Sequence, residues 1–224
     1  MKHMHMQKNL MKKIALWGGG ILAIGAIFGF LWWSYTQSNP ESENITPISQ
    51  SDWIRGNQNA PVRIIVYSDF QCPACKYYAS FMDRIVSDEG TNVALVYRNF
   101  PLYQNHPYTL AASFAAEAAG KQGKFWDMHA MLFTKQDEWL QSKNIDEAQG
   151  FFKSYAKTLK LDVNQFSQDM ASRDIMDKVF AQYQMGIHDH VQWTPTIFIN
   201  STRIQNPQSY DAFKALVDQA LHAR

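Results

Sequence analysis

Phe70-Gln71-Cys72-Pro73-Ala74-Cys75 contains both cysteines of this 224-residue chain. The preceding run, residues 62–67, is short, apolar and rich in β-branched side chains, which is typical of a buried strand. Apolar side chains then recur at the spacing of one helical face over residues 74–87. Proline is favoured at the first position of a helix, where its missing N–H would have no partner. The sequence therefore predicts a helix that begins at Pro73, with Cys72 as its N-cap.

A sulfur at a helix N-cap faces the unpaired N–H groups of the first turn and the positive end of the helix dipole. Both favour the thiolate, so we expect the pKa of Cys72 to be lowered. Cys75 follows one turn later, close enough to form a disulfide with Cys72 and otherwise buried under the helix. A lowered thiolate pKa also makes the disulfide a stronger oxidant, by roughly 30 mV per pKa unit. The motif, with Pro73 and Ala74 inside it, predicts an exposed acidic thiol and a resolving thiol.

Two other interpretations of the cysteine pair remain open at this point. The same residues would suit an inert disulfide outside the cell, or two of the ligands of a metal site. Two cysteines exclude a disulfide-stapled scaffold and a four-cysteine zinc site. His188-Asp189-His190 has ligand-type residues, but no adjacent Glu or Cys completes the set. We therefore favour redox chemistry and expect neither a metal nor a cofactor.

Composition narrows the class of protein further. The chain is 46% hydrophobic and 18% charged, which excludes a disordered or low-complexity protein. Its formal charge of +1 gives no reason to expect nucleic-acid binding. The charge is unevenly distributed, because residues 1–40 hold four lysines and no acid, whereas residues 41–224 hold 17 basic and 20 acidic residues. The first forty residues therefore form a segment of different character.

Residues 14–33 form an uncharged apolar run, long enough at about 1.5 Å per helical residue to cross the roughly 30 Å core of a bilayer. Four lysines precede the run and the first charges after it are acidic, so the positive-inside rule places the N-terminus in the cytoplasm. A cleaved signal peptide is the alternative, but bulky side chains at positions 30–33 argue against cleavage.

These features predict a single-pass protein of the cell membrane whose C-terminal domain lies outside the cytoplasm. The expected parts are a cytoplasmic tail (residues 1–13), a transmembrane signal-anchor (residues 14–35), a linker (residues 36–55) and a folded domain (residues 56–224).

The folded domain alternates strand and helix. Residues 93–97 predict a second strand, and a β-α-β unit places its two strands parallel, with a right-handed crossover. The apolar period is then helical over about residues 105–188, and strand character returns at 196–199 and 203–204. A last amphipathic helix is expected over residues 207–222. This order predicts an α/β fold with a helical insertion.

Several motifs together resemble a known family. Thr194-Pro195-Thr196 precedes the first strand after the helical block, where we expect it to face the start of the Cys72 helix. Combined with the cysteine motif, it resembles the DsbA-type branch of the thioredoxin superfamily over about residues 52–222. Further similar segments are Ala60-Pro61-Val62, Ser68-Asp69, Tyr97-Arg98-Asn99-Phe100-Pro101-Leu102, Ala115-Ala116-Glu117-Ala118-Ala119, Gly123-Lys124-Phe125-Trp126-Asp127-Met128-His129 and Ile197-Phe198-Ile199-Asn200.

The resemblance, to membrane-anchored proteins of the DsbA and BdbD type, implies a thioredoxin-like fold and protein thiol-disulfide oxidoreductase activity. In that family a substrate thiolate attacks the first cysteine, here Cys72, a mixed disulfide forms, and the second, here Cys75, leaves. The backbone around Thr194, beside a cis Pro195, would hold the substrate peptide. The implied partners are exported proteins with free or paired cysteines, and a quinone-linked membrane oxidase resembling DsbB or the vitamin K epoxide reductase group.

Two positions depart from the family pattern. Ala74 stands where the best-known members have a histidine that stabilises the thiolate, so we expect a milder oxidant. Val66 stands where the family often has a buried glutamate that handles the proton of the second cysteine. Asp69 is three residues further along, which places it on the other face of the strand. The acceptor for the proton of Cys75 is therefore open, with water as one candidate.

The leading hypothesis is an oxidase that introduces disulfide bonds into exported proteins. A reductase or isomerase that uses the same site is the alternative, because the sequence does not set the direction of electron flow. A tethered client-binding or chaperone module with incidental cysteines is a hypothesis from a different class. His129, on an apolar helical face, is expected to be a core residue, and Trp193 to help form an apolar substrate groove beside Pro195.

Overall fold

The computed structural model of the protein describes residues 24–33 and 45–223. Residues 24–33 form a helix, while the predicted cytoplasmic tail, the rest of the predicted signal-anchor and the first half of the predicted linker lie outside the described residues. Within the described ranges, no helix is both long and apolar enough to cross a membrane. The chain divides into two units, residues 1–41 and 42–224, and the sheet with its helices belongs to the second.

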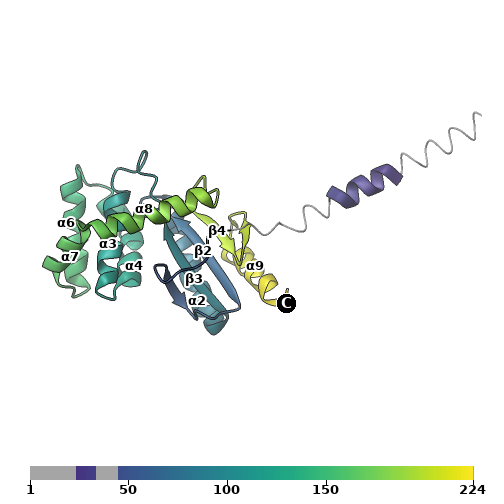
Figure 1. Ribbon diagram of the computed structural model, residues 1–224, viewed down its shortest axis with the longest axis horizontal. Coiled ribbons are helices and arrows are strands. Elements are labelled where there is room, and N and C mark those ends of the chain that lie inside the picture. Colours follow the sequence, from purple (N-terminus) through teal and green to yellow (C-terminus); the bar gives the residue numbers. More distant parts are fainter. Residues whose placement is uncertain (1–23, 34–44, 224) are drawn as a thin grey trace, which may run out of the picture. The chain divides into compact units, whose positions relative to one another are not determined.

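A five-stranded mixed sheet forms the centre of this second unit, in the order β1-β3-β2-β4-β5 (Figure 1). Its strands are β1 (Trp53–Gly56), β2 (Val62–Ser68), β3 (Val93–Asn99), β4 (Thr196–Ile199) and β5 (Thr202–Ile204). β2 and β3 are parallel, as predicted, with Val66 opposite Tyr97. The other pairings are antiparallel. β3 extends beyond the predicted end and is buried throughout, because it lies between two other strands.

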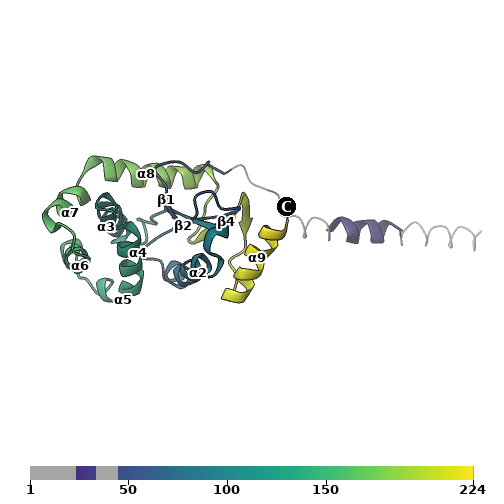
Figure 2. The same ribbon diagram turned by 90° about the horizontal axis from the view of Figure 1, so that it is seen from below.

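Helices cover both faces of the sheet (Figure 2). α2 (Pro73–Glu89) and α9 (Tyr210–His222) pack on one face, and α8 (Arg173–His188) packs on the other. Because successive side chains of a strand point to opposite faces, Val66 joins the core beneath α2 and Ile65 joins the core beneath α8. β2 is therefore apolar in continuous runs rather than in alternation, as its sequence indicates.

The predicted helical insertion is confirmed and lies between β3 and β4. Its helices group at one end of the sheet, and α8 returns from that group over the sheet (Figure 1). They are α3 (Thr109–Lys121), α4 (Phe125–Thr134), α5 (Gln136–Trp139), α6 (Ile145–Thr158), α7 (Val163–Met170) and α8. α3 is rich in alanine because it is buried among its neighbours. Asn144 and Asp162 cap α6 and α7 by accepting hydrogen bonds from backbone N–H groups of the first turn.

The second half of the predicted linker belongs to the folded domain, so the predicted boundary at residue 56 is wrong. Trp53 begins β1, which pairs antiparallel with β3 at the edge of the sheet. Its indole stacks on Phe125 at 4.6 Å between ring centroids and donates a 2.8 Å hydrogen bond from Nε1 to Glu117. A side chain at Gly120 would collide with this indole. The polar composition of the segment concealed these contacts, because they depend on a few residues distant in sequence.

Arg98 ties the segment before β1 to the sheet. Its guanidinium is fully buried and binds both carboxylate oxygens of Asp52 at 3.0 Å. It also donates to the Tyr67 hydroxyl at 2.8 Å and to the carbonyl oxygens of Thr46 and Pro47. Tyr67 in turn donates a 2.5 Å hydrogen bond to the buried Asp189. One cation therefore satisfies two buried carboxylates and the backbone of a segment that has little regular structure.

We expect Arg98→Met to lower the free energy of unfolding by about 3–5 kcal/mol, because it leaves two buried carboxylates without their cation. Urea denaturation of the reduced protein measures this loss. Arg173→Met is the matched control, since Arg173 is largely exposed and lies 3.7 Å from an exposed Asp177. Its loss should stay below about 1 kcal/mol. Equal losses in the two variants would contradict the role assigned to Arg98.

Candidate active site

Cys72 and Cys75 occupy the positions predicted for them. Cys72 is the N-cap of α2, with extended backbone angles (φ −71°, ψ 124°), and Pro73 is the first helical residue. Cys75 lies in the first turn, on the buried face of the helix. Both are free thiols in this structure. The strand β2 ends at Ser68, so a short loop carries the chain from the sheet to the helix.

Cys72 is less exposed than the sequence predicts. Its exposed fraction is 7%, against 2% for Cys75. The loop before β4 lies against it, with Cys72 Sγ 3.5 Å from the carbonyl oxygen of Thr194. The Thr194–Pro195 peptide bond is cis, as the resemblance implied. A reacting sulfur therefore has only a narrow approach to Cys72, beside the Thr194–Pro195 loop.

The pKa of Cys72 is lowered, as predicted, but the main cause differs from the one expected. A hydrogen bond from the Cys75 thiol is the largest contribution, and it lowers the pKa of Cys72 to about 6 against the opposing effect of burial. The side chain of Thr194 contributes next, and the backbone N–H groups of Cys75 and Ala74 contribute last. The Thr194 hydroxyl has no other partner within the described part of the chain, so it can donate to the thiolate. The second cysteine, rather than the helix end, is the main stabiliser of the first.

Cys75 has the opposite tendency. Burial raises the pKa of its thiol well above the ordinary value, and a thiolate on Cys72 raises it further. The backbone N–H of Asp69 donates to Cys75 Sγ at 3.4 Å, and Ser68 also favours the thiolate. At neutral pH the reduced site therefore holds a thiolate at Cys72 and a protonated thiol at Cys75.

Asp69 and Gln136 hold the loop that carries Cys72, a role that the sequence does not reveal. The buried Asp69 carboxylate accepts hydrogen bonds from the backbone N–H groups of Gln71 and Leu102 at 2.7 Å each. It also accepts one from the Thr109 hydroxyl at 2.6 Å and lies 2.8 Å from His106 Nδ1.

Gln136 reaches the same loop from the helical insertion. Its Nε2 donates to the carbonyl oxygen of Phe70 at 2.7 Å and to that of Cys72 at 3.1 Å. Both residues are polar side chains near the cysteines, but Gln136 is 64 positions away, so local sequence carries no signal of its contact.

The structure bears out the expectation that the Asp69 carboxylate does not serve Cys75. Its two oxygens face the loops at residues 71, 102, 106 and 109, and only its backbone N–H contacts the sulfur. Val66, at the position of the family's glutamate, is apolar and lies near the same sulfur. The proton of Cys75 therefore needs another acceptor.

A hollow of about 500 Å³ adjoins the Thr194–Pro195 loop. It is lined by Trp193, Arg203, Ile204, Gln205 and Asn206. Asn206 Nδ2 donates a 2.8 Å hydrogen bond to the carbonyl oxygen of Pro195, which ties the wall of the hollow to the loop. Trp193 is half exposed, as expected of a residue that lines a groove rather than a core.

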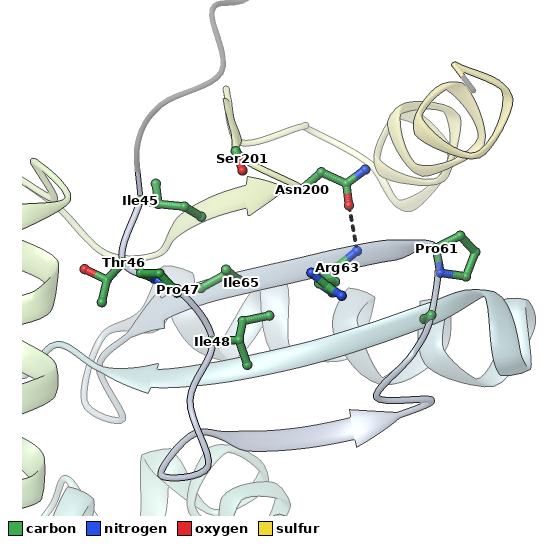
Figure 3. Close-up of a pocket in the computed structure, with 10 residues that line it drawn as sticks. Ile45, Thr46, Pro47, Ile48, Pro61, Arg63, Ile65, Asn200 and Ser201 are labelled. Carbon is green, nitrogen blue, oxygen red and sulfur yellow. Dashed lines mark hydrogen bonds between the residues drawn. The ribbon is translucent and has the colours of Figure 1, made fainter.

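A second hollow, of about 460 Å³, lies on the face of the sheet that is opposite to Cys75 (Figure 3). Ile65 lines it, whereas its neighbour Val66 lies near Cys75 on the other face. Residues 45–48 pass over the strands here, and Asn200 accepts a hydrogen bond from the backbone N–H of Arg63 (Figure 3). No cysteine lines this hollow, so it is separate from the Cys72–Cys75 site.

The fold and the cysteine pair together define a class. A parallel β-α-β unit places a Cys-x-x-Cys pair at a helix start, a cis-proline loop faces the first cysteine, and a helical insertion packs against the loop. These features are those of thioredoxin-like proteins that carry a Cys-x-x-Cys motif and a helical insertion. The chain belongs to the thioredoxin family, whose model, described as "Thioredoxin", matches residues 49–219.

Solved structures with the same fold include BdbD from Bacillus subtilis in its oxidised form and alpha-DsbA1 from Wolbachia pipientis. BdbD is 24% identical, with a TM-score of 0.69, and the match covers 82% of this chain and 99% of BdbD. Alpha-DsbA1 is 21% identical, with a TM-score of 0.68, and the match covers 79% of this chain and 94% of alpha-DsbA1. These likenesses establish the fold, and the predicted thioredoxin-like fold with a helical insertion is confirmed.

Curated relatives are longer proteins. One is a Na(+)/H(+) antiporter NhaA 3 from Salinispora tropica, 34% identical over 169 residues, which are 75% of this chain and 24% of the relative. Another is a Na(+)/H(+) antiporter NhaA 1 from Salinispora arenicola, also 34% identical over 169 residues with the same coverage. The chain thus spans about a quarter of the length of these relatives.

We expect alkylation of Cys72 in the reduced protein to be half-maximal near pH 6, because only the thiolate reacts. Cys75→Ala removes the main donor to that thiolate. A charge-assisted hydrogen bond of about 1.5–3 kcal/mol corresponds to a rise of roughly one to two pKa units. Iodoacetamide kinetics with peptide mapping measure both values. A midpoint near 9 in the unmodified protein would contradict the stabilisation described above.

Proposed function

We propose that this protein is a thiol-disulfide oxidase that introduces disulfide bonds into exported proteins through Cys72 and Cys75. The observation that carries the proposal is the unequal environment of the two sulfur atoms. Cys72 is stabilised as a thiolate beside a narrow opening, whereas Cys75 is buried and favours its protonated form. This asymmetry separates the sulfur that exchanges with a substrate from the sulfur that resolves the exchange.

The proposed cycle begins with the Cys72–Cys75 disulfide. A substrate thiolate attacks Cys72 Sγ, a mixed disulfide forms, and Cys75 leaves with the electron pair and takes up a proton. A second substrate thiolate then attacks the substrate sulfur of the mixed disulfide. The substrate leaves with a new disulfide, and Cys72 is released as a thiolate. Two electrons pass to this protein in each cycle, so an external oxidant must return it to the disulfide.

The acidity of Cys72 favours the oxidising direction. At pH 7 a thiol with a pKa of about 6 is mostly ionised, which stabilises the reduced protein by about 1.4 kcal/mol, or roughly 30 mV, relative to an unshifted thiol. This stabilisation grows as pH rises from about 6 towards the ordinary thiol value and disappears below pH 6. Cys75 adds nothing at pH 7, because it is protonated there with or without its shift. A reductase or isomerase with the same site is the second candidate.

The substrate would be an extended peptide that lies against the Thr194–Pro195 loop. The carbonyl oxygen of Thr194 is 3.5 Å from Cys72 Sγ, so backbone hydrogen bonds at this loop would hold a substrate cysteine against the reacting sulfur. The adjoining hollow offers the Trp193 ring for apolar contacts beside the polar groups of Arg203 and Asn206. This combination suits unfolded segments of varied sequence.

The activity and the direction are tested by oxidative refolding of a reduced, unfolded client protein. We expect the oxidised protein to accelerate disulfide formation and Cys72→Ser to abolish the effect, because the attacked sulfur is lost. Equilibration with glutathione should give a reduction potential between about −200 and −120 mV, above the roughly −270 mV of thioredoxin. A value near that of thioredoxin would favour the reductase. Full activity of Cys72→Ser would favour a client-binding module with incidental cysteines.

We further propose that residues 14–35 anchor the protein in the cell membrane, with the domain outside the cytoplasm. Disulfide bonds persist outside the cytoplasm. A quinone-linked membrane oxidase resembling DsbB or the vitamin K epoxide reductase group would reoxidise Cys72 and Cys75 in that compartment. Lysines precede the apolar run and the first charged residues after it are acidic, which supports this orientation.

The orientation is tested on intact cells with a maleimide that does not cross membranes. A cysteine introduced at the exposed position Gln208 should be labelled in whole cells, whereas one introduced at position 5 should react only after lysis. The Cys72→Ser, Cys75→Ser background avoids labelling of the native pair. Protection of the cysteine at position 208 until lysis would place the domain in the cytoplasm and overturn this part of the proposal.

A further inference from the structure

A small cavity adjoins Cys75. Its volume of about 10 Å³ is the room that the centre of a single water molecule needs. Its walls come from α2, from β2 and β3, from α4 and from the loop before β4. The lining residues are Val66, Ser68, Cys75, Tyr78, Ala79, Met82, Leu95, Tyr97, His129 and Pro195.

Two polar atoms in the walls of this cavity are buried and unsatisfied. Tyr97 Oη and His129 Nδ1 have no hydrogen-bond partner within the described part of the chain. Both residues are almost completely buried, at 1% and 4% exposed. Buried polar groups are nearly always satisfied by protein or ordered water, and a buried water needs two to four polar partners. Ser68 and the Cys75 thiol supply further partners, so the cavity suits one bound water.

His129 is the basic group in this wall. Rings of Phe70, Tyr97, Phe133 and Trp126 surround its imidazole, with centroid distances of 4.9–5.6 Å. Burial, aided by the positive charge of Arg55, lowers the pKa of His129 to about 3. The resting imidazole is therefore neutral, and a neutral imidazole has one nitrogen that can accept a proton.

We propose that His129, through one water molecule in this cavity, exchanges the proton of Cys75 during the thiol-disulfide reaction. The inference rests on the proposed function, because it concerns the step of that reaction in which Cys75 gains or loses its proton. It assigns to His129, on α4 of the helical insertion, the part that a glutamate at the position of Val66 plays elsewhere in the family.

The proton and the electrons balance in each direction. When a mixed disulfide at Cys72 is resolved, Cys75 Sγ attacks Cys72 Sγ, and the bond from Cys72 to the outer sulfur breaks. The outer sulfur leaves as a thiolate with the electron pair. The Cys75 proton passes to the water as a proton of that water passes to His129, and the imidazolium then releases it to solvent. In the oxidising direction the same steps run in reverse, and the leaving Cys75 receives the proton.

The charges around the cavity explain why His129 can act only during the reaction. A thiolate that develops on Cys75 favours the imidazolium, because opposite charges attract strongly in a buried site. Arg55 of β1 opposes this change, and Tyr78 of α2 and Tyr97 of β3 are the other titratable groups that face the site. The histidine is thus neutral at rest and becomes basic when Cys75 loses its proton.

His129→Phe and His129→Asn test the proposal in the full-length protein. Phenylalanine suits the aromatic surroundings of position 129 but has no acceptor. Asparagine keeps an oxygen close to the place of Nδ1 and can hold the water, but it cannot take a proton. Both variants should unfold at a urea concentration close to that of the unmodified protein, because conservative substitutions in a core cost little stability. They should also retain the pH dependence of Cys72 alkylation, because the pKa of Cys72 is set by Cys75, Thr194 and the first turn of α2.

Reduced protein is mixed with oxidised glutathione, quenched with acid at intervals and analysed by mass. Formation of the mixed disulfide at Cys72 reports the first step, and its conversion to the Cys72–Cys75 disulfide reports the second. We expect unchanged formation and a conversion slowed by about 10²-fold in both variants, as is typical for loss of a general acid-base group. The conversion rate of the variants should rise about tenfold per pH unit, since hydroxide must replace the imidazole, while the unmodified protein should show a shallower rise.

The two steps separate failure of this inference from failure of the proposed function. If the unmodified protein forms no mixed disulfide at Cys72, the proposed function fails. If the mixed disulfide forms and His129→Phe resolves it at the unmodified rate and pH dependence, only the role of His129 is overturned. Normal resolution in His129→Asn alone would also overturn proton transfer, because it would mean that position 129 merely holds the water.

Discussion

The unequal burial of two sulfur atoms, one helical turn apart, is the constraint on which this site depends. The sheet and α2 enclose Cys75, so the proton of its thiol is hard to remove. That thiol instead donates to Cys72 and stabilises the thiolate there. Cys72 is the N-cap of α2 and Cys75 lies in its first turn, and this difference in position gives two identical side chains opposite pKa shifts.

The helical insertion contributes directly to this division. Gln136 of α5 binds the backbone on both sides of Gln71 and so holds the loop that presents Cys72. His129 of α4 closes the cavity behind Cys75. The insertion therefore forms part of the surroundings of the two cysteines, and its position between β3 and β4 allows it to reach the start of α2.

The other face of the sheet depends on a different interaction. Arg98 is buried there with Asp52 and Asp189, and it binds the carbonyl oxygens of a segment that has no regular structure of its own. A sequence pattern of apolar periodicity does not reveal such a contact, because the segment looks like a polar linker. The error in the predicted domain boundary has this physical origin: a few charged and polar contacts can order a chain that has little apolar surface.

The sequence by itself determined the order of strands and helical regions from β2 onward, the parallel β-α-β unit and the placement of Cys72 at the start of α2. It also determined the cis-proline loop, through its family resemblance. These features follow from local patterns: apolar spacing, a proline at a helix start and two cysteines three positions apart. Only the tertiary structure decided how far Cys72 is covered, which group stabilises its thiolate and which side chains surround Cys75. Those properties depend on residues such as Thr194, Gln136 and His129, which lie more than fifty positions from the cysteines, and only folding brings them together.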